Sequence, residues 1–145
     1  MKIFNFNRPR LQVYTDGAIR PERQLSGLAA VVVDERGHIR HWWSCQAGPL
    51  TNNEAEYAAV IFALQRLLLI QPLEIVLYSD SRTVVEQMQG RARARSENMR
   101  HAYQQARTLA AGFPHISFHH IPRERNRLAD ALANETADGF RPQVQ

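Results

Sequence analysis

The 145-residue sequence contains one cysteine, one lysine and no run of 18 apolar residues. The lone Cys45 cannot form an internal disulfide, which excludes a disulfide-stabilised scaffold and favours a reducing compartment. The lack of a long apolar run excludes a transmembrane span. The first ten residues contain no long apolar stretch and no small-residue cleavage site, so we expect no secretory signal and a cytoplasmic location.

Apolar residues make up 44% of the chain, enough to bury a core at this length. Disordered and collagen-like classes are therefore excluded. No repeat, low-complexity segment or linker rich in Pro, Gly or Ser divides the sequence. We expect a single domain over residues 1–145, with a core at about 10–138, a frayed tail at 139–145 and a monomeric state.

The 18 basic and 14 acidic residues leave a net charge of +4, and every basic residue except Lys2 is an arginine. Guanidinium groups bind phosphate oxygens in pairs, so this surplus is compatible with a polyanionic partner such as nucleic acid. An ordinary, slightly basic protein rich in arginine remains the alternative.

Hydrophobic periodicity and turn residues predict secondary structure in the order βββαβααβα. The expected strands are residues 10–16, 27–34, 38–47, 74–80 and 115–122, and the expected helices are 51–70, 81–90, 96–111 and 125–138. The first three strands can pair antiparallel, whereas strands separated by helices need right-handed crossovers. We therefore predict an α/β fold with a mixed five-stranded sheet and helices on both faces.

Two aspartates follow buried strand patterns. Asp16 comes after the apolar positions Leu11 and Val13, and Asp80 comes after the run at 75–79. Ligand sites of open α/β sheets gather at the carboxyl ends of strands, which makes both residues candidates. Capping of the following turn or helix is the alternative for each.

A glutamate on the longest predicted helix faces the wrong way for a surface residue. At about 100° per residue, Glu56 shares an apolar stripe with Val60, Ala63 and Leu67, whereas Glu54 lies on the polar side. A carboxylate facing a core is costly unless it is paired, protonated or bound to a cation. Glu54 fits a solvated first-turn acid favoured by the helix dipole, so Glu56 is the functional candidate.

Asp130 shares one side of the last helix with Ala133 and Ala137, whose small side chains permit close backbone approach. Capping does not explain it, because Asn126 is the better N-cap candidate. An exposed surface acid is the alternative.

Taken together, Asp16, Glu56, Asp80 and Asp130 would repel one another if they were gathered, and there is no lysine to pair them. A multivalent cation resolves that repulsion. Oxygen ligands without a Cys/His cluster favour Mg²⁺ or Mn²⁺ over zinc. Two such ions about 3.5–4 Å apart can activate water and stabilise the leaving oxygen in phosphodiester cleavage. The four acids therefore predict a two-metal nuclease site.

Four segments of the sequence resemble the catalytic blocks of type 1 ribonuclease H. They are TDGA at 15–18, TNNEAEYAA at 51–59, YSDS at 78–81 and RNRLADALA at 125–133. The resemblance spans about residues 10–138 and implies a ribonuclease H-like fold. It also implies hydrolysis of the RNA strand of RNA–DNA hybrids with two Mg²⁺ ions, leaving a 3′-hydroxyl and a 5′-phosphate. Matched block to block, the metal-binding catalytic acids are Asp16, Glu56, Asp80 and Asp130.

The same resemblance implies contacts with the substrate. It places Asn52 and Asn53 against the hybrid near the scissile region, and Gly17 where the backbone comes close. Basic residues would contact the DNA strand's phosphates, and selectivity would come from the 2′-hydroxyls in the minor groove. Double-stranded RNA is left open as a second substrate.

Two departures from the family pattern matter. Many members carry a histidine in a mobile loop before the last helix, but here the connection is the shorter IPRERN at 121–126, so Arg123 or Glu124 occupies that place. An arginine there can hold the scissile phosphate but cannot move a proton near neutral pH. His119 and His120 lie upstream, where positions in the fifth strand are expected.

The second departure is the short segment GRARARSEN at 90–98, which replaces a basic protrusion found in the well-known bacterial members. The sequence in this respect resembles archaeal, plant-type and some bacterial members. Arg91, Arg93 and Arg95 either supply part of the grip on the hybrid or form an ordinary solvated loop.

Two other functions remain as alternatives. A DNA-acting nuclease or strand-transferase of the same fold usually needs only three acids and brings extra DNA-binding domains. A catalytically silent hybrid-binding module would not need to keep Glu56 on an apolar stripe.

Overall fold

The computed structural model describes residues 8–139, which form a five-stranded sheet of order β3-β2-β1-β4-β5. The strands are β1 (Arg10–Arg20), β2 (Leu25–Val33), β3 (Ile39–Ala47), β4 (Glu74–Ser79) and β5 (His115–His120). The helices are α1 (Asn52–Ile70), α2 (Arg82–Met88), α3 (Glu97–Ala110) and α4 (Arg127–Ala137), with short 3-10 segments η2 (Pro21–Arg23) and η3 (Arg123–Arg125). The predicted order of strands and helices is confirmed.

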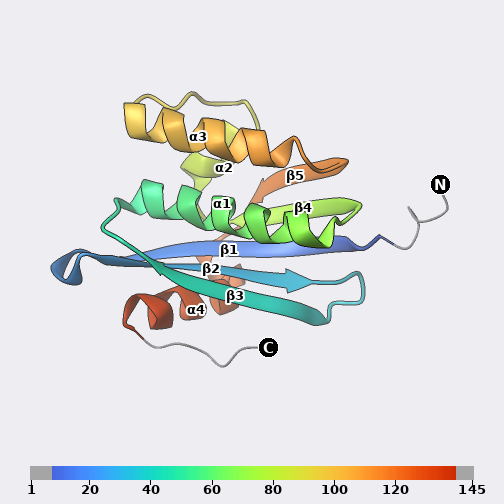
Figure 1. The fold of residues 1–145 in the computed structure, drawn as a ribbon, viewed down its shortest axis with the longest axis horizontal. Coiled ribbons are helices and arrows are strands. Elements are labelled where there is room, and N and C mark those ends of the chain that lie inside the picture. The colour runs from blue at the N-terminus through green and yellow to red at the C-terminus, as the bar shows by residue number, and fades with distance from the viewer. Residues whose placement is uncertain (1–7, 140–145) are drawn as a thin grey trace.

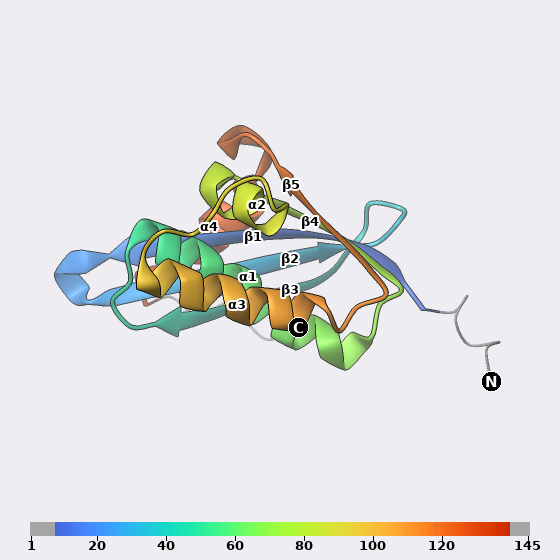
Figure 2. The same ribbon diagram turned by 90° about the horizontal axis from the view of Figure 1, so that it is seen from above.

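The sheet is mixed, as predicted. β1 pairs antiparallel with β2 and parallel with β4, while β2–β3 is antiparallel and β4–β5 is parallel. Helices α1, α2 and α3 cover one face and α4 covers the other (Figure 1). The view from above shows α1 and α3 lying over the strands (Figure 2). No helix within residues 8–139 is long and apolar enough to cross a membrane.

Two cores hold these layers together. The larger core joins the sheet to α1, α2 and α3, and α1 contributes Val60, Leu64 and Leu67 to it. The smaller core lies under α4 and consists largely of alanines, with Leu132 as its largest side chain. Because small side chains let a helix approach a strand closely, α4 sits tightly against β1 and β2.

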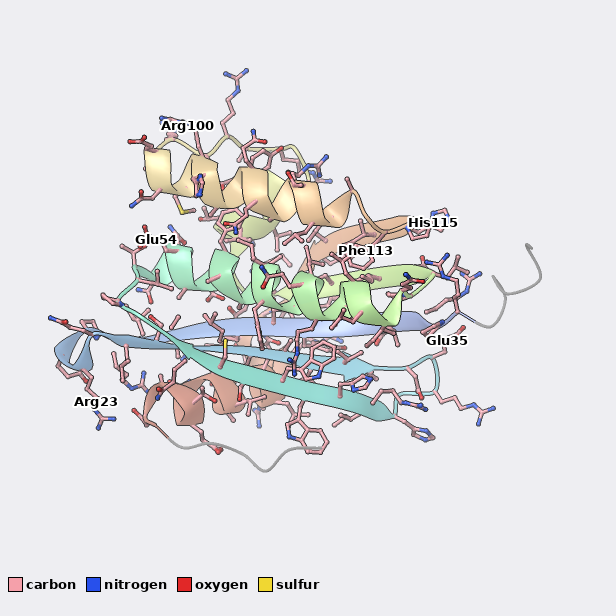
Figure 3. The ribbon with its side chains drawn as sticks, in the orientation of Figure 1. Arg23, Glu35, Glu54, Arg100, Phe113 and His115 are labelled. Carbon is pink, nitrogen blue, oxygen red and sulfur yellow. The ribbon has the colours of Figure 1, made fainter. Side chains whose placement is uncertain are left out.

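The N-terminus of α1 is fixed by a capping box and by α3. Thr51 Oγ1 accepts the amide of Glu54 and Glu54 Oε1 accepts the amide of Thr51, so two otherwise unpaired donors are satisfied. Asn98 Nδ2 of α3 also donates to Glu54 Oε2 at 2.8 Å. Figure 3 shows Glu54 at this end of α1. The prediction that Glu54 is an ordinary first-turn acid therefore needs one addition, the link to α3.

The first strand is longer than predicted. Its pairing with β4 ends at Thr15↔Ser79, but its pairing with β2 continues to Arg20↔Leu25. The prediction that Asp16 ends the strand is therefore wrong: Asp16 lies within β1, one residue beyond the point where the parallel partner stops.

The last helix is shorter than predicted. It begins at Arg127, because residues 123–125 form the separate segment η3. Residues 140–145 of the expected frayed tail lie outside the described part of the chain. Residues 1–7, in the segment where no secretory signal is expected, also lie outside it.

Candidate active site

Three carboxylates meet where β1, β4 and α1 come together. Asp16, Glu56 and Asp80 each offer one oxygen, and these oxygens lie within 4.8 Å of one another. They line a cavity of about 400 Å³ that Asp130 of α4 also lines. All four predicted acids therefore reach one cavity, three of them as a tight cluster and Asp130 beside it.

The sheet register accounts for the two aspartates. Thr15 of β1 is paired with Ser79 of β4, so the next residues along these parallel strands, Asp16 and Asp80, lie side by side. Asp16 is almost fully buried. Burial, together with the neighbouring charges of Asp80 and Asp130, raises the pKa of Asp16 to about 7.

The helix phase accounts for Glu56. Val60, Ala63 and Leu67, which share its stripe of α1, are fully buried, so the predicted orientation of Glu56 toward the interior is confirmed. The pKa of Glu56 is raised to about 9, mainly by burial and further by the charges of Asp16 and Asp80.

Gly17 fixes the spacing between β1 and α1. A Cβ at Gly17 would lie 2.4 Å from the carbonyl oxygen of Ala55, so no larger residue fits there without moving the helix. Its amide donates to Asp16 Oδ1 at 3.0 Å and to Glu56 Oε1 at 3.2 Å. The close approach seen here is to α1, while the expected contact with the hybrid stays a prediction.

Asp130 is held differently from the cluster of three. Its side chain is 30% exposed, and Arg123 Nη2 lies 3.6 Å from its Oδ1. Asn134, one turn further along α4, donates to the same oxygen at 3.2 Å. Asp130 therefore faces the cavity from a more open position.

The predicted substrate residues divide into two groups. Asn52 and Arg123 line the cavity with the acids, whereas Asn53 is exposed and outside it. Between the two candidates for the place of the family's histidine, Arg123 lines this cavity and Glu124 lines a neighbouring groove.

Both histidines lie in β5 as expected. His119 bonds Ser117 Oγ at 2.9 Å, and His120 is paired with Ser79. In the connection between α2 and α3, Arg91, Arg93 and Arg95 are exposed, and their part in binding stays a prediction.

The sequence patterns missed the role of Asn126. It occupies the predicted N-cap position of α4, but its side chain makes no capping bond. It is 1% exposed, and its Nδ2 donates to the carbonyl oxygen of Thr15 at 2.9 Å and to Asp80 Oδ2 at 3.4 Å. Asn126 thus ties α4 to β1 and to Asp80. The sequence feature that could have indicated a role at the site is its position four residues before Asp130.

The cluster has the chemistry of a divalent-cation site. Within residues 8–139, no arginine forms an ion pair with Asp16, Glu56 or Asp80, so their charges are not compensated by the protein. Burial first, and then repulsion from the neighbouring carboxylates, raises the pKa values of Asp16 and Glu56. Closely spaced carboxylate oxygens fit the preference of hard cations such as Mg²⁺ and Mn²⁺.

We expect the ion-free protein to lose stability as the pH rises from about 5 to about 9. The pKa values of Asp16 and Glu56 in the folded protein, about 7 and about 9, exceed their ordinary values of 3.8 and 4.5. In this window the folded protein keeps protons that the unfolded chain has released, so rising pH favours unfolding. In EDTA the melting temperature should fall by several degrees, on the order of 5 °C, and Mg²⁺ should reduce the fall.

Glu56→Gln is the control for this pH experiment. It removes one member of the cluster and keeps every other titrating group, so the difference between the two plots of melting temperature against pH reports on the cluster alone. A pH dependence that is the same in both proteins would contradict the shifted pKa values.

Comparison with known proteins gives a consistent result. The family model described as reverse transcriptase-like matches residues 14–136. The chain is 36% identical to Ribonuclease HI of Halobacterium salinarum over 129 residues, 89% of this chain and 65% of that protein. The crystal structure of RNase H1 from that archaeon has a TM-score of 0.85, covering 90% of this chain and 98% of that one.

Two further relatives agree. The bifunctional protein Rv2228c of Mycobacterium tuberculosis is 35% identical over 89% of this chain and 36% of its own length, and its N-terminal RNase H domain has a TM-score of 0.84. LC11-RNase H1, crystallised in complex with an RNA/DNA hybrid, is 34% identical with a TM-score of 0.83, covering 90% of this chain and 98% of that one.

The sheet order, the carboxylate cluster and these matches define a ribonuclease H-like domain. The chain belongs to the ribonuclease H family, and its resemblance to the type 1 members is confirmed. It spans 36% of the length of the mycobacterial relative and 65% of the length of the halobacterial one.

Proposed function

We propose that this protein is an endoribonuclease that hydrolyses the RNA strand of RNA–DNA hybrids, leaving a 3′-hydroxyl and a 5′-phosphate. The observation that carries the proposal is the convergence of four acids, from β1, the residue after β4, α1 and α4, on one cavity of a ribonuclease H fold. A relative at 34% identity binds such a hybrid in its crystal structure, which supports the choice of substrate.

Four acids would form the metal site in this proposal. Asp16 and Asp80 would hold two Mg²⁺ ions, with Mn²⁺ as an alternative, and Glu56 and Asp130 would complete the ligand sets. Ions bound in this way supply an activated water and stabilise charge on the leaving oxygen. A cation would relieve the repulsion among these closely spaced carboxylates, which supports this assignment. Its binding would displace the protons that Asp16 and Glu56, with their raised pKa values, hold near neutral pH.

The remaining residues around the cavity would bind and orient the hybrid. Arg123 would hold the scissile phosphate, since a guanidinium offers paired donors to phosphate oxygens. Asn52 and Asn53, exposed in the first turn of α1, would contact the hybrid beside the acids, and the backbone at Gly17 would approach it. We further propose that the chain forms one domain, acts as a monomer and works in the cytoplasm.

The test is an end-labelled RNA–DNA hybrid incubated with Mg²⁺ and, in parallel, with EDTA. We expect cleavage of the RNA strand alone, with 3′-hydroxyl products, and no cleavage after chelation, because the four acids cannot activate water without an ion. Duplex DNA and duplex RNA run as matched substrates. Cleavage of duplex DNA would favour a DNA-acting nuclease, and binding without cleavage would favour a silent module. Cleavage of duplex RNA would extend the substrate range.

A further inference from the structure

Arg20, the last residue of β1, reaches across to α4. Its Nε donates to Asp138 Oδ1 at 2.7 Å, its Nη2 donates to Asn134 Oδ1 at 2.9 Å and its Nη1 donates to the carbonyl oxygen of Ile19 at 2.9 Å. The Arg20 side chain is only 23% exposed. Because three acceptors in different directions hold the guanidinium, its position relative to α4 is defined.

The bond from Arg20 determines which way the Asn134 amide points. A guanidinium can only donate, so the oxygen of Asn134 must face Arg20 and its NH₂ group must face the other way. That NH₂ group donates to Asp130 Oδ1 at 3.2 Å and to the carbonyl oxygen of Asp130 at 2.8 Å. The orientation of Asn134, and with it the donor offered to Asp130, is therefore set from β1.

Asp130 is the acid that needs this support. Asp16 and Glu56 are fixed by burial and by the shared amide of Gly17, whereas Asp130 is partly exposed. The guanidinium of Arg123, an exposed side chain, lies beside the same oxygen that Asn134 binds. A hydrogen bond to one carboxylate oxygen limits the rotamers of Asp130 and leaves the second oxygen for a ligand.

We propose that Arg20 and Asn134 are positioning residues, a relay that holds the Asp130 carboxylate in the orientation in which it binds metal. The inference rests on the proposed function. Both residues line the same cavity as the four acids, so the relay lies within reach of the chemistry it would serve.

The chain offers a matched control for Arg20. Arg23 also binds Asp138, with Nη1 3.2 Å from its carbonyl oxygen and 3.7 Å from Oδ1, but no bond joins it to Asn134. Its side chain is 53% exposed, and Figure 3 shows it projecting from the connection between β1 and β2. A change at Arg23 removes contacts with Asp138 and leaves the relay intact.

The test compares four variants: Arg20→Ala, Asn134→Asp, the double variant and the control Arg23→Ala. In Asn134→Asp an oxygen still accepts from Arg20 and the shape is kept, but the donor to Asp130 is replaced by a carboxylate that repels it. We expect kcat on the hybrid to fall about 10-fold in each of the first two variants, with KM changed by less than about twofold. The double variant should be no worse than the single ones, since both break one relay. Arg23→Ala should retain its activity.

A second readout does not depend on activity. Calorimetric titration of the substrate-free protein with Mn²⁺ should show weaker binding in Arg20→Ala than in the unchanged protein and in Arg23→Ala. Unchanged kcat and Mn²⁺ affinity in Arg20→Ala would overturn the relay, and so would losses that multiply in the double variant. A change in KM alone for Arg20→Ala would mean that Arg20 binds substrate directly. If the unchanged protein binds Mn²⁺ but does not cleave the hybrid, the proposed function fails while the titration still decides on the relay; absence of Mn²⁺ binding would overturn both.

Discussion

The Glu56→Gln variant is expected to lose at least about 10³-fold in kcat on an RNA–DNA hybrid while its hybrid affinity changes by less than about threefold. Glutamine keeps the size of the side chain and its place on α1, but it removes one anionic oxygen from the cluster with Asp16 and Asp80. A neutral amide is a poor ligand for Mg²⁺ beside two carboxylates. The residues expected to contact the hybrid are untouched, so cleavage and binding should separate.

The same variant should fold at least as well as the unchanged protein. Without a bound ion, the pKa of Glu56 is about 9, so at neutral pH the side chain is already uncharged and resembles glutamine. The melting temperature in EDTA should therefore be equal or higher at pH 7–8. Loss of activity with retained stability would assign the defect to the site rather than to the fold.

Glu54→Gln is the matched control, two residues earlier on the same helix. Glu54 lies outside the acid cavity, and glutamine can keep the capping box with Thr51. Activity should stay within about twofold of the unchanged protein. Steady-state kinetics measure cleavage, and fluorescence anisotropy of a labelled hybrid in EDTA measures hybrid affinity. A fully active Glu56→Gln protein would refute its assignment as a metal ligand, and equal loss in both variants would point to a general effect on α1.

The contrast between Glu56 and Glu54 shows what the sequence could establish about the site. Helical phase depends only on local geometry, and the stripe of Val60, Ala63 and Leu67 identified the buried side of α1 correctly. The order of the strands and helices followed for the same reason, because each has its own hydrophobic period. The positions of the four acids predicted a two-metal nuclease site, and the family resemblance then added the substrate and the products.

Contacts between distant segments lay beyond the sequence patterns. The strand end at Asp16 was misplaced because continued pairing with β2, not a change in the local pattern, extends β1 to Arg20. Asparagine is a residue type typical of a helix N-cap, yet the bond from Asn126 to Thr15 joins residues 111 positions apart. Arg20 and Asn134 are likewise separated by 114 positions. Such partners become visible only when the fold brings them together.

The common element in these contacts is α4. It carries Asp130 and Asn134, and Asn126 precedes its first residue, so its distance from β1 controls the position of Asp130 directly and that of Asp80 through a hydrogen bond. The distance between α4 and β1 is set by the packing of α4 against β2 at Gly27.

Gly27→Ala is accordingly expected to destabilise the protein by about 3–5 kcal/mol, lowering the melting temperature by on the order of 10 °C or more. An added Cβ would lie 2.1 Å from the carbonyl oxygen of Ala133 and 2.5 Å from the amide nitrogen of Ala137, and backbone atoms cannot turn aside as a side chain can. Gly48→Ala is the control, because no atom lies within 4 Å of its added Cβ and its stability should be unchanged. Thermal and urea unfolding measure the loss, and a melting temperature of Gly27→Ala within about 2 °C of the control would contradict the close packing of α4. Because relief of the clash requires α4 to move away from β2, kcat measured below the melting temperature should fall as well, through displacement of Asp130 from the other three acids.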